Sequence, residues 1–121
     1  MASEMTTAEV RDKVAGLDGW TTYKASNGLT VWEFGSIDDG TYTTATDHPI
    51  TDTLDACAAA WDRHAGSDGW TWGRVEDPIG WTWSADCRGK VCMVEAAGHD
   101  AASELRDRWA LLGEVLKARG V

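Results

Sequence analysis

Two Trp-Thr-Trp triplets lie close together in the stretch from Gly69 to Ala85, which reads GWTWGRVEDPIGWTWSA. Within each triplet the indoles are two residues apart, and this spacing places side chains on the same face of a β-strand. The segment Glu76-Asp77-Pro78 separates the triplets. It favours a turn, because Asp-Pro initiates turns and proline cannot donate to a strand ladder. The pattern therefore predicts a β-hairpin.

The pairing of the two strands decides which side chains meet. If Val75 pairs with Gly80, residues 72 and 83 lie directly opposite each other. All the indoles of the hairpin then share one face with Arg74. These indoles are Trp70, Trp72, Trp81 and Trp83. A face of this kind must either be buried in a core or bind a ligand.

The chain before this hairpin predicts a helix and three strands. Thr6 and Glu9 have the spacing of a capping box, so a helix is expected to start there and to end before Gly19. Turns are expected at Asn27-Gly28 and at 38–40, because these residue types tolerate positive φ or favour turns. The strands around these turns are expected at 20–24, 29–34 and 41–44.

Two further helices are predicted, with a strand between them over 90–96. Thr51 or Asp52 can cap the second helix. Its apolar side is formed by Leu54, Ala58, Trp61 and Ala65. Gly98-His99-Asp100 caps the last helix, and Gly120 ends it. The apolar stripe of this last helix is Leu105, Trp109, Leu112 and Leu116.

These elements predict an α+β fold in which a mainly antiparallel sheet packs between helices, an α-β-α sandwich. The chain of 121 residues has room for one domain, assigned to 7–119, after a disordered start over 1–6. Asp18-Gly19-Trp20-Thr21 recurs as Asp68-Gly69-Trp70-Thr71, and each copy follows a helix and precedes a hairpin. This repetition suggests two α-β-β units.

The charge of the chain disfavours two classes of partner. The net charge is −9, so the surface repels nucleic-acid phosphates and anionic membranes. No apolar run is long enough to span a membrane, and the first residues lack the apolar core of a secretory signal. A cytoplasmic location in the host cell is therefore expected.

Neither a cofactor nor a catalytic centre is predicted. Cys57, Cys87 and Cys92 are expected to be free thiols, and the spacing of the last two from His99 matches no closed zinc site. The sequence contains no Ser-His-Asp or Cys-His arrangement, no phosphate-binding glycine loop and no HExxH motif. All three histidines border helix ends or turns, and they are His48, His64 and His99. We therefore expect a protein that is not an enzyme and holds no metal.

The order of these motifs resembles that of the phage ABA sandwich domain, a family of small phage and prophage proteins that mostly lack an assigned reaction. The matching pieces lie between residues 8 and 118 and are Gly19-Trp20, Trp32, Tyr42-Thr43, Ala59-Ala60-Trp61, Gly69-Trp70-Thr71-Trp72, Trp83-Ser84-Ala85 and the segment 101–116. The last helix departs from the family pattern, because Ser103-Glu104-Leu105-Arg106 stands where members often show Ala-Ile-Cys-Arg-Ala. The resemblance implies phage origin and a sheet between helices. It carries over no catalytic residue.

The tryptophans have two interpretations. Eight buried indoles would supply much of the core of a domain this small, at ~25 cal/mol per Å² of apolar surface. Alternatively, some of them form an aromatic and cationic pocket for a small nucleotide, because aromatic faces stack bases and a guanidinium holds phosphate. The candidate residues of that pocket are Trp72, Arg74, Trp81, Trp83, Arg88 and Lys90.

Three functions stay open. The favoured one is a phage accessory or anti-defence protein that binds a host protein with a basic patch through an acidic helix face, formed by Asp52, Asp55 and Asp62. The second is a protein that sequesters a nucleotide signal in the aromatic pocket. The third is a structural domain of a phage particle or replication complex. A strand edge over 41–44 would either allow a homodimer or be covered by a loop.

Overall fold

The computed structural model describes residues 5–77, 80–96, 98 and 100–121. The side chains of residues 77, 80 and 81 also lie outside this description, so the predictions for Trp81, for His99 and for the first four residues are not tested. The chain divides into a large unit, residues 1–10 with 52–121, and a small unit, residues 11–51. This division does not test whether one domain extends over 7–119, which stays a prediction.

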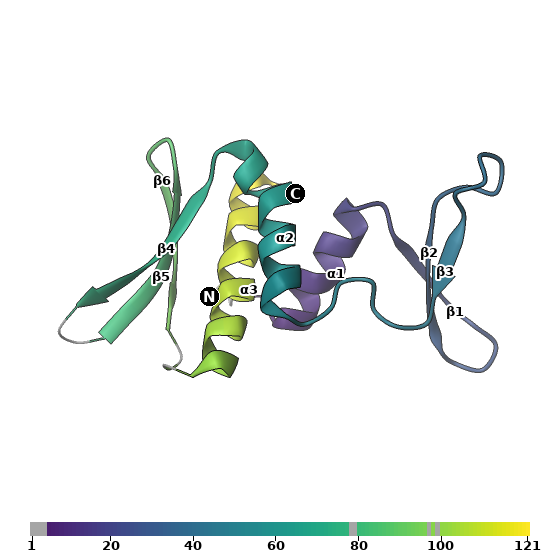
Figure 1. Cartoon of the computed structure of the whole chain (residues 1–121), viewed down its shortest axis with the longest axis horizontal. Helices are drawn as coiled ribbons and strands as arrows, with labels where there is room; N and C mark the ends of the chain where they lie inside the picture. The colour runs from purple at the N-terminus through teal and green to yellow at the C-terminus, as the bar shows by residue number, and fades with distance from the viewer. Residues whose placement is uncertain (1–4, 78–79, 97, 99) are drawn as a thin grey trace. The chain divides into compact units, whose positions relative to one another are not determined.

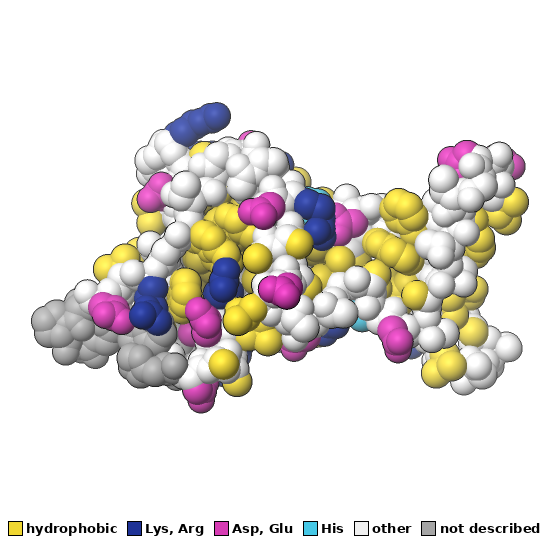
Figure 2. Space-filling view, viewed as in Figure 1, with side chains coloured by type: hydrophobic (Ala, Val, Ile, Leu, Met, Phe, Trp, Pro, Cys, Tyr) yellow, Lys and Arg dark blue, Asp and Glu magenta, His cyan; other side chains and the backbone are white. Residues whose placement is uncertain are grey.

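The small unit contains the second half of helix α1 (Thr7–Leu17) and a three-stranded antiparallel sheet. Its strands are β1 (Thr21–Lys24), β2 (Thr30–Phe34) and β3 (Thr43–Ala45), in that order across the sheet. The core of this unit is thin. Hydrophobic side chains reach the surface over β1, β2 and β3 in Figure 2, and the most exposed large ones are Tyr23, Leu29 and Ile37.

The large unit contains the first turn of α1, the helices α2 and α3, and the tryptophan hairpin (Figure 1). Its elements are α2 (Leu54–His64), a 3-10 turn (Gly66–Asp68), β4 (Thr71–Asp77), β5 (Gly80–Cys87), β6 (Lys90–Glu95) and α3 (Ala101–Arg119). The strands form a second antiparallel sheet in the order β4-β5-β6. Helix α3 packs on β5 and β6 and also on α2. The centre of α3 is fully buried, as Trp109 and Leu112 show.

The predicted α+β class with antiparallel pairing is confirmed. The strands nevertheless form two separate sheets of three strands instead of a single one. The physical reason lies in the connections. Each sheet is a meander of strands that follow one another along the chain, and antiparallel neighbours need only a short turn. Helix α2 separates β3 from β4, and none of the described residues pairs these two strands.

Most helix ends were predicted correctly from local signals in the sequence. The Thr6 amide donates to Glu9 Oε1 at 3.0 Å and the Glu9 amide donates to Thr6 Oγ1 at 3.2 Å, which confirms the capping box. Asp100 caps α3, and Gly120 ends it in the left-handed region. The predicted cap of α2 is wrong by one or two residues. Thr53 caps this helix, because its hydroxyl accepts from the Ala56 amide at 3.1 Å.

The predicted pairing of the tryptophan hairpin is wrong by two residues. Val75 pairs with Thr82, so Trp72 lies opposite Ala85 and Arg74 lies opposite Trp83. The reason is that the ladder continues to the pair formed by residues 77 and 80 and therefore extends further toward the loop than expected. A shift of two residues keeps every side chain on its predicted face. Trp72, Arg74 and Trp83 accordingly share one face of the sheet.

The two copies of the Asp-Gly-Trp-Thr motif adopt the same turn. Gly19 and Gly69 both have positive φ, 103° and 92°, a conformation that favours glycine. The Trp20 amide donates to the Ala15 carbonyl at 2.9 Å, and the Trp70 amide donates to the Ala65 carbonyl at 3.1 Å. The strand after each turn begins at the threonine. The suggested repetition therefore extends to the hydrogen bonds of the backbone.

Candidate functional site

The tryptophans of the hairpin belong to the core of the large unit. The rings of Trp61 on α2 and Trp72 on β4 stack with their centroids 4.5 Å apart and their planes 10° apart. The Arg108 guanidinium carbon from α3 lies 3.9 Å from the centroid of Trp72 and 5.8 Å from that of Trp83. Trp83 is only 8 % exposed. Two helices thus cover the aromatic face that the sequence offered as a ligand site.

The cationic candidates of the nucleotide pocket lie apart, with Arg74 in the middle of edge strand β4 and the other two at the β5–β6 turn. Arg74 pairs with Glu76, two residues further along the edge strand, at 3.2 Å between Nη2 and Oε1. Arg88 and Lys90 lie at the β5–β6 turn, where Arg88 has φ 52°. They line a different concavity of about 450 Å³, together with Asp68, Trp70, Cys87, Ala118 and Arg119. The five predicted residues with described side chains therefore do not form one pocket.

The acidic candidates differ in what they contact. Asp52, Asp55 and Asp62 are all exposed, as expected for a solvated helix face. Asp52, however, accepts a hydrogen bond at 3.0 Å from the indole Nε1 of the fully buried Trp109. Asp52 therefore has a structural role, while the contact of Asp52, Asp55 and Asp62 with a partner stays a prediction.

In the part of the large unit that the structure describes, no helix covers the second face of the β4-β5-β6 sheet (Figure 1). Its side chains alternate with Trp72, Trp83 and the other helix-facing positions, and we call them the open face: Thr71, Gly73, Val75, Thr82, Ser84, Asp86, Val91, Met93 and Glu95. Three of these are large apolar side chains that are more than half exposed, namely Val75 at 54 %, Met93 at 59 % and Val91 at 61 %. Among the described residues, the charged members are acidic.

The small unit holds a pocket that the sequence interpretation missed. It has a volume of about 670 Å³ and is lined by Asp12, Gly16, Trp20, Thr21, Thr22, Thr30, Trp32 and His48. The side chains of Thr22 and Trp32 are directly paired across β1 and β2 and so share one face of the sheet. We refer to it as the small-unit pocket.

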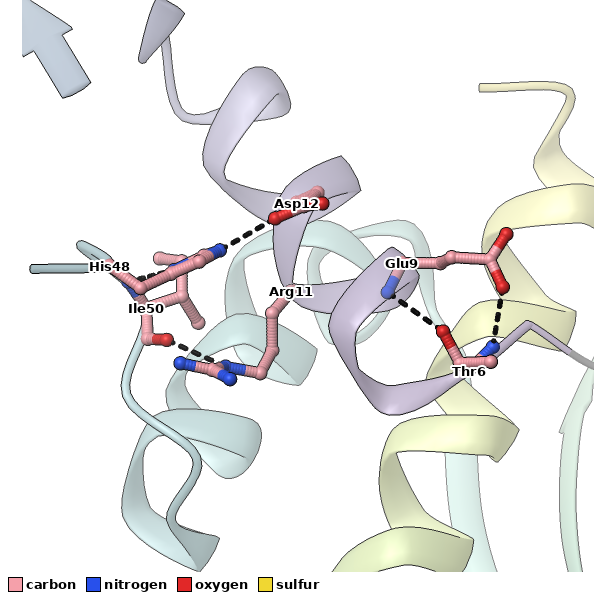
Figure 3. Close-up of polar contacts among 6 residues, drawn as sticks. All are labelled: Thr6, Glu9, Arg11, Asp12, His48 and Ile50. Atoms are coloured by element: carbon pink, nitrogen blue, oxygen red, sulfur yellow. Dashed lines mark hydrogen bonds and ion pairs between the residues drawn. The ribbon is translucent and has the colours of Figure 1, made fainter. Parts of the chain in front are cut away.

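An Asp-His pair borders this pocket (Figure 3). His48 Nε2 lies 2.8 Å from Asp12 Oδ1, and the Ile50 amide donates to His48 Nδ1 at 3.0 Å. Because Nδ1 accepts from an amide, the proton of the neutral ring is on Nε2 and points to the carboxylate. Arg11 Nε also donates to the Ile50 carbonyl at 2.8 Å. These contacts hold the loop around Ile50 and leave neither histidine nitrogen available as a general base.

Burial disfavours the reactive form of two of the three thiols. Burial raises the pKa of Cys57 to about 12 and also raises the pKa of Cys92, and both shifts favour the neutral thiol over the reactive thiolate. In the part of the chain that the structure describes, no three His, Cys, Asp or Glu side chains are grouped as ligands for a metal ion. No helix among those residues is long and apolar enough to cross a membrane.

Comparison of the chain with family models, with curated proteins and with solved structures gave no match. The resemblance to the phage ABA sandwich domain therefore stays a prediction. The surface features that support a functional proposal are the open face, the small-unit pocket and the concavity at the β5–β6 turn.

Proposed function

We propose that this chain is a non-enzymatic binding protein that docks through its open face onto a basic surface of another protein. The observation that carries the proposal is the exposure of three large apolar side chains on one sheet face, with Val91 and Met93 side by side on β6 and Val75 on β4. Exposed apolar patches with a polar rim are typical of protein interaction sites. Burial of these three side chains supplies a hydrophobic gain that the isolated chain does not obtain.

The charge selects the kind of partner. The chain carries a net charge of −9, and the described charged residues of the open face are Asp86 and Glu95. A basic partner surface is attracted by this field, whereas a second copy of the chain brings two acidic faces together. The proposal therefore commits to a basic protein. If the resemblance to phage proteins holds, that partner is a host protein and the chain is an accessory or anti-defence factor.

Catalysis is not part of the proposal. The most enzyme-like group, the pair of Asp12 and His48, has both ring nitrogens engaged, by Asp12 and by the Ile50 amide. The Cys57 thiol has a raised pKa and is buried. These two observations favour binding over turnover.

The test compares lysine substitutions at two exposed apolar positions. Met93→Lys alters the open face, and Ile37→Lys changes an exposed side chain of the small unit as a matched control. Wild type is cross-linked in bacterial lysate, the captured protein is identified and purified, and its Kd is measured for each variant. We expect Met93→Lys to weaken binding at least tenfold, Ile37→Lys to leave it unchanged, and higher salt to slow association.

Two results would count against the proposal. One is a stoichiometric partner that binds wild type and Met93→Lys equally well. The other is a partner lost from a double variant of Asp55→Lys and Asp62→Lys but retained by Met93→Lys, which would move the interface to the acidic face of α2. Asp52 stays unchanged in that variant, because it bonds to the core residue Trp109.

A second candidate function is supported by the concavity at the β5–β6 turn. Arg88, Lys90 and Arg119 line it beside Trp70, and three cations in one hollow favour a phosphate-bearing ligand such as a nucleotide. Arg119 is partly neutralised by Asp68, 3.4 Å away. A nucleotide that binds there raises the melting temperature of wild type and of Arg74→Ala, but not that of Arg88→Ala. A loss of the response only in Arg74→Ala contradicts this candidate.

The homodimer stays a separate prediction. Strand β3 (Thr43–Ala45) is an edge of its sheet, so its free backbone groups are available for pairing.

A further inference from the structure

The small-unit pocket has the size and the lining of a site for a small ligand. Its volume of about 670 Å³ falls within the range of ~300–1,000 Å³ that is usual for such sites. Two indoles, Trp20 and Trp32, give it apolar walls. Trp20 is in turn held by Phe34, with ring centroids 5.3 Å apart, and Trp32 by His48, with centroids 4.4 Å apart. The aromatic walls are therefore fixed in place.

Hydroxyl groups and one carboxylate provide the polar contacts of the pocket. Thr21, Thr22 and Thr30 line it along β1 and β2, and Asp12 lines it from α1. The Asp12 carboxylate receives one hydrogen bond from His48, yet a carboxylate offers about four lone-pair sites. Lys24 Nζ bonds to the Thr30 hydroxyl at 2.8 Å, so a cationic donor lies beside the lining.

This combination selects among ligand classes. An anion is repelled by Asp12, the one formally charged side chain that lines the pocket. An apolar ligand would strip water from the hydroxyls of Thr22 and Thr30 without replacing their hydrogen bonds, whereas the Thr21 hydroxyl donates to Glu33 on the other face of the sheet. A purely cationic ligand would meet the neighbouring Lys24 ammonium. A sugar ring meets none of these penalties, because it is neutral, has an apolar C–H face for an indole and carries hydroxyls that both donate and accept.

Comparison of the two copies of the Asp-Gly-Trp-Thr repeat shows which indoles of the large unit have no counterpart in the small unit. The first strand pair after the first turn is Thr21 with Glu33. The equivalent pair after the second turn is Thr71 with Asp86. Counting along both ladders, Thr22 occupies the place of Trp72, and Thr30 the place of Trp83. In the large unit these two indoles are covered by Trp61 and Arg108. In the small unit their places hold threonines, which line an open pocket.

We propose that the small-unit pocket binds the pyranose ring of a saccharide, with the sugar's C–H face against Trp20 or Trp32 and its hydroxyls on Asp12, Thr22 and Thr30. The Asp12 carboxylate accepts from two neighbouring sugar hydroxyls, and such charge-assisted bonds are stronger than neutral ones. This site is independent of the docking proposed for the open face and uses other residues.

The binding experiment follows the indole N–H signals of the intact protein by NMR during titration with maltotriose and with the trimer of N-acetylglucosamine. Single-residue Trp→Phe variants assign the signals. We expect saturable shifts at Trp20 and Trp32 and none at Trp109, which is fully buried in the large unit. Glucose and N-acetylglucosamine serve as single-ring arms. Equal affinity for a monosaccharide and its trisaccharide assigns the site to a free sugar. Tighter binding of the trisaccharide assigns it to a glycan chain.

Three variants test the assignment to this pocket. Gly16 lines the pocket, and a Cβ atom at this position would meet no other atom within 4 Å. Gly16→Leu therefore fills the pocket, whereas Gly16→Ala adds one methyl group and should retain binding. Asp12→Asn keeps an acceptor for His48 but removes the charge, and should weaken binding about tenfold. Thr22→Val should weaken it by a similar factor, while Thr44→Val on β3, outside the pocket, should not.

Two outcomes overturn the proposal. The first is the absence of a saturable shift at Trp20 and Trp32 of wild type with either trisaccharide or either monosaccharide. The second is equal affinity in wild type, Gly16→Leu and Asp12→Asn, which would place any sugar contact elsewhere. Backbone amide spectra of each variant show that it is folded before its affinity is compared.

Discussion

Substitution of Gly113 by alanine tests how closely α1 and α3 approach in the large unit. A Cβ atom at position 113 would lie 2.8 Å from Val10 Cγ2 and 3.5 Å from the nearest atoms of Met5. Carbon atoms in contact prefer ~3.5–4.0 Å, so the new methyl group would be about 1 Å too close. Val10 is fully buried. Its β-branched side chain has one strongly preferred rotamer in a helix, so it cannot turn away.

Helix propensity and overpacking change the stability of Gly113→Ala in opposite directions. Alanine is a better helix former than glycine by about 1 kcal/mol. Overpacking a rigid contact costs about 1–3 kcal/mol, and the stiffness of Val10 places this case at about 2–3 kcal/mol. We therefore expect Gly113→Ala to lower the free energy of unfolding by about 1–2 kcal/mol, or the melting temperature by about 4–8 °C.

Gly16→Ala is the matched control, because the same substitution in α1 meets no atom within 4 Å. It should stabilise the protein by about 0.5 kcal/mol through helix propensity alone. Both variants are measured by urea unfolding with circular dichroism and tryptophan fluorescence. In a double-mutant cycle, Val10→Ala should recover about 1–2 kcal/mol of the Gly113→Ala loss. If Gly113→Ala were as stabilising as Gly16→Ala, the close approach of the two helices would be refuted.

Two further predictions concern buried groups of the large unit. Burial raises the pKa of Cys57 from 9.0 to about 12, so its stabilising contribution is complete below pH 9 and is lost as pH rises from 9 to 12. Between pH 8 and 10, wild type should lose about 1 kcal/mol more unfolding free energy than Cys57→Ala, and equal losses in urea titrations would contradict this. Asp52→Ala should cost about 1–2 kcal/mol, because the buried Trp109 indole loses its acceptor, whereas Asp62→Ala should change stability by less than about 0.5 kcal/mol. Similar thermal melts for the two aspartate variants would exclude a structural role for Asp52.

Interactions between residues close in sequence were predictable. The capping box of Thr6 and Glu9 and the Asp100 cap need only a spacing of three residues, so the residue pattern contains all the information. The two Asp-Gly-Trp-Thr turns were predictable for the same reason, since glycine permits the positive φ at 19 and 69. Even the faces of the tryptophan hairpin were correct, because a pairing error of two residues preserves the alternation.

Contacts between distant residues were not predictable from one sequence. The pair of Asp12 and His48 joins residues 36 positions apart, and the bond from Trp109 to Asp52 spans 57. Nothing in the local pattern of either partner indicates the other. A weak signal existed for the small-unit pocket. At the offset of 50 the second copy of the repeat has Trp72 where the first has Thr22, and this difference in volume indicates a difference in packing; the match of Thr30 to Trp83 emerges only from the strand pairing.

The number of indoles in a segment is thus a poor guide to where a ligand binds. The hairpin richest in tryptophan lies under α2 and α3, and Arg108 occupies the π surface of Trp72 that a nucleobase would need. The small unit has only Trp20 and Trp32, but residues 11–51 contain no helix besides the end of α1. No helix covers the aromatic side chains there as α2 and α3 cover the hairpin, and these side chains border a pocket. Whether an indole is covered or lines a pocket depends on the element packed against it, and the two copies of the α-β-β repeat show both cases.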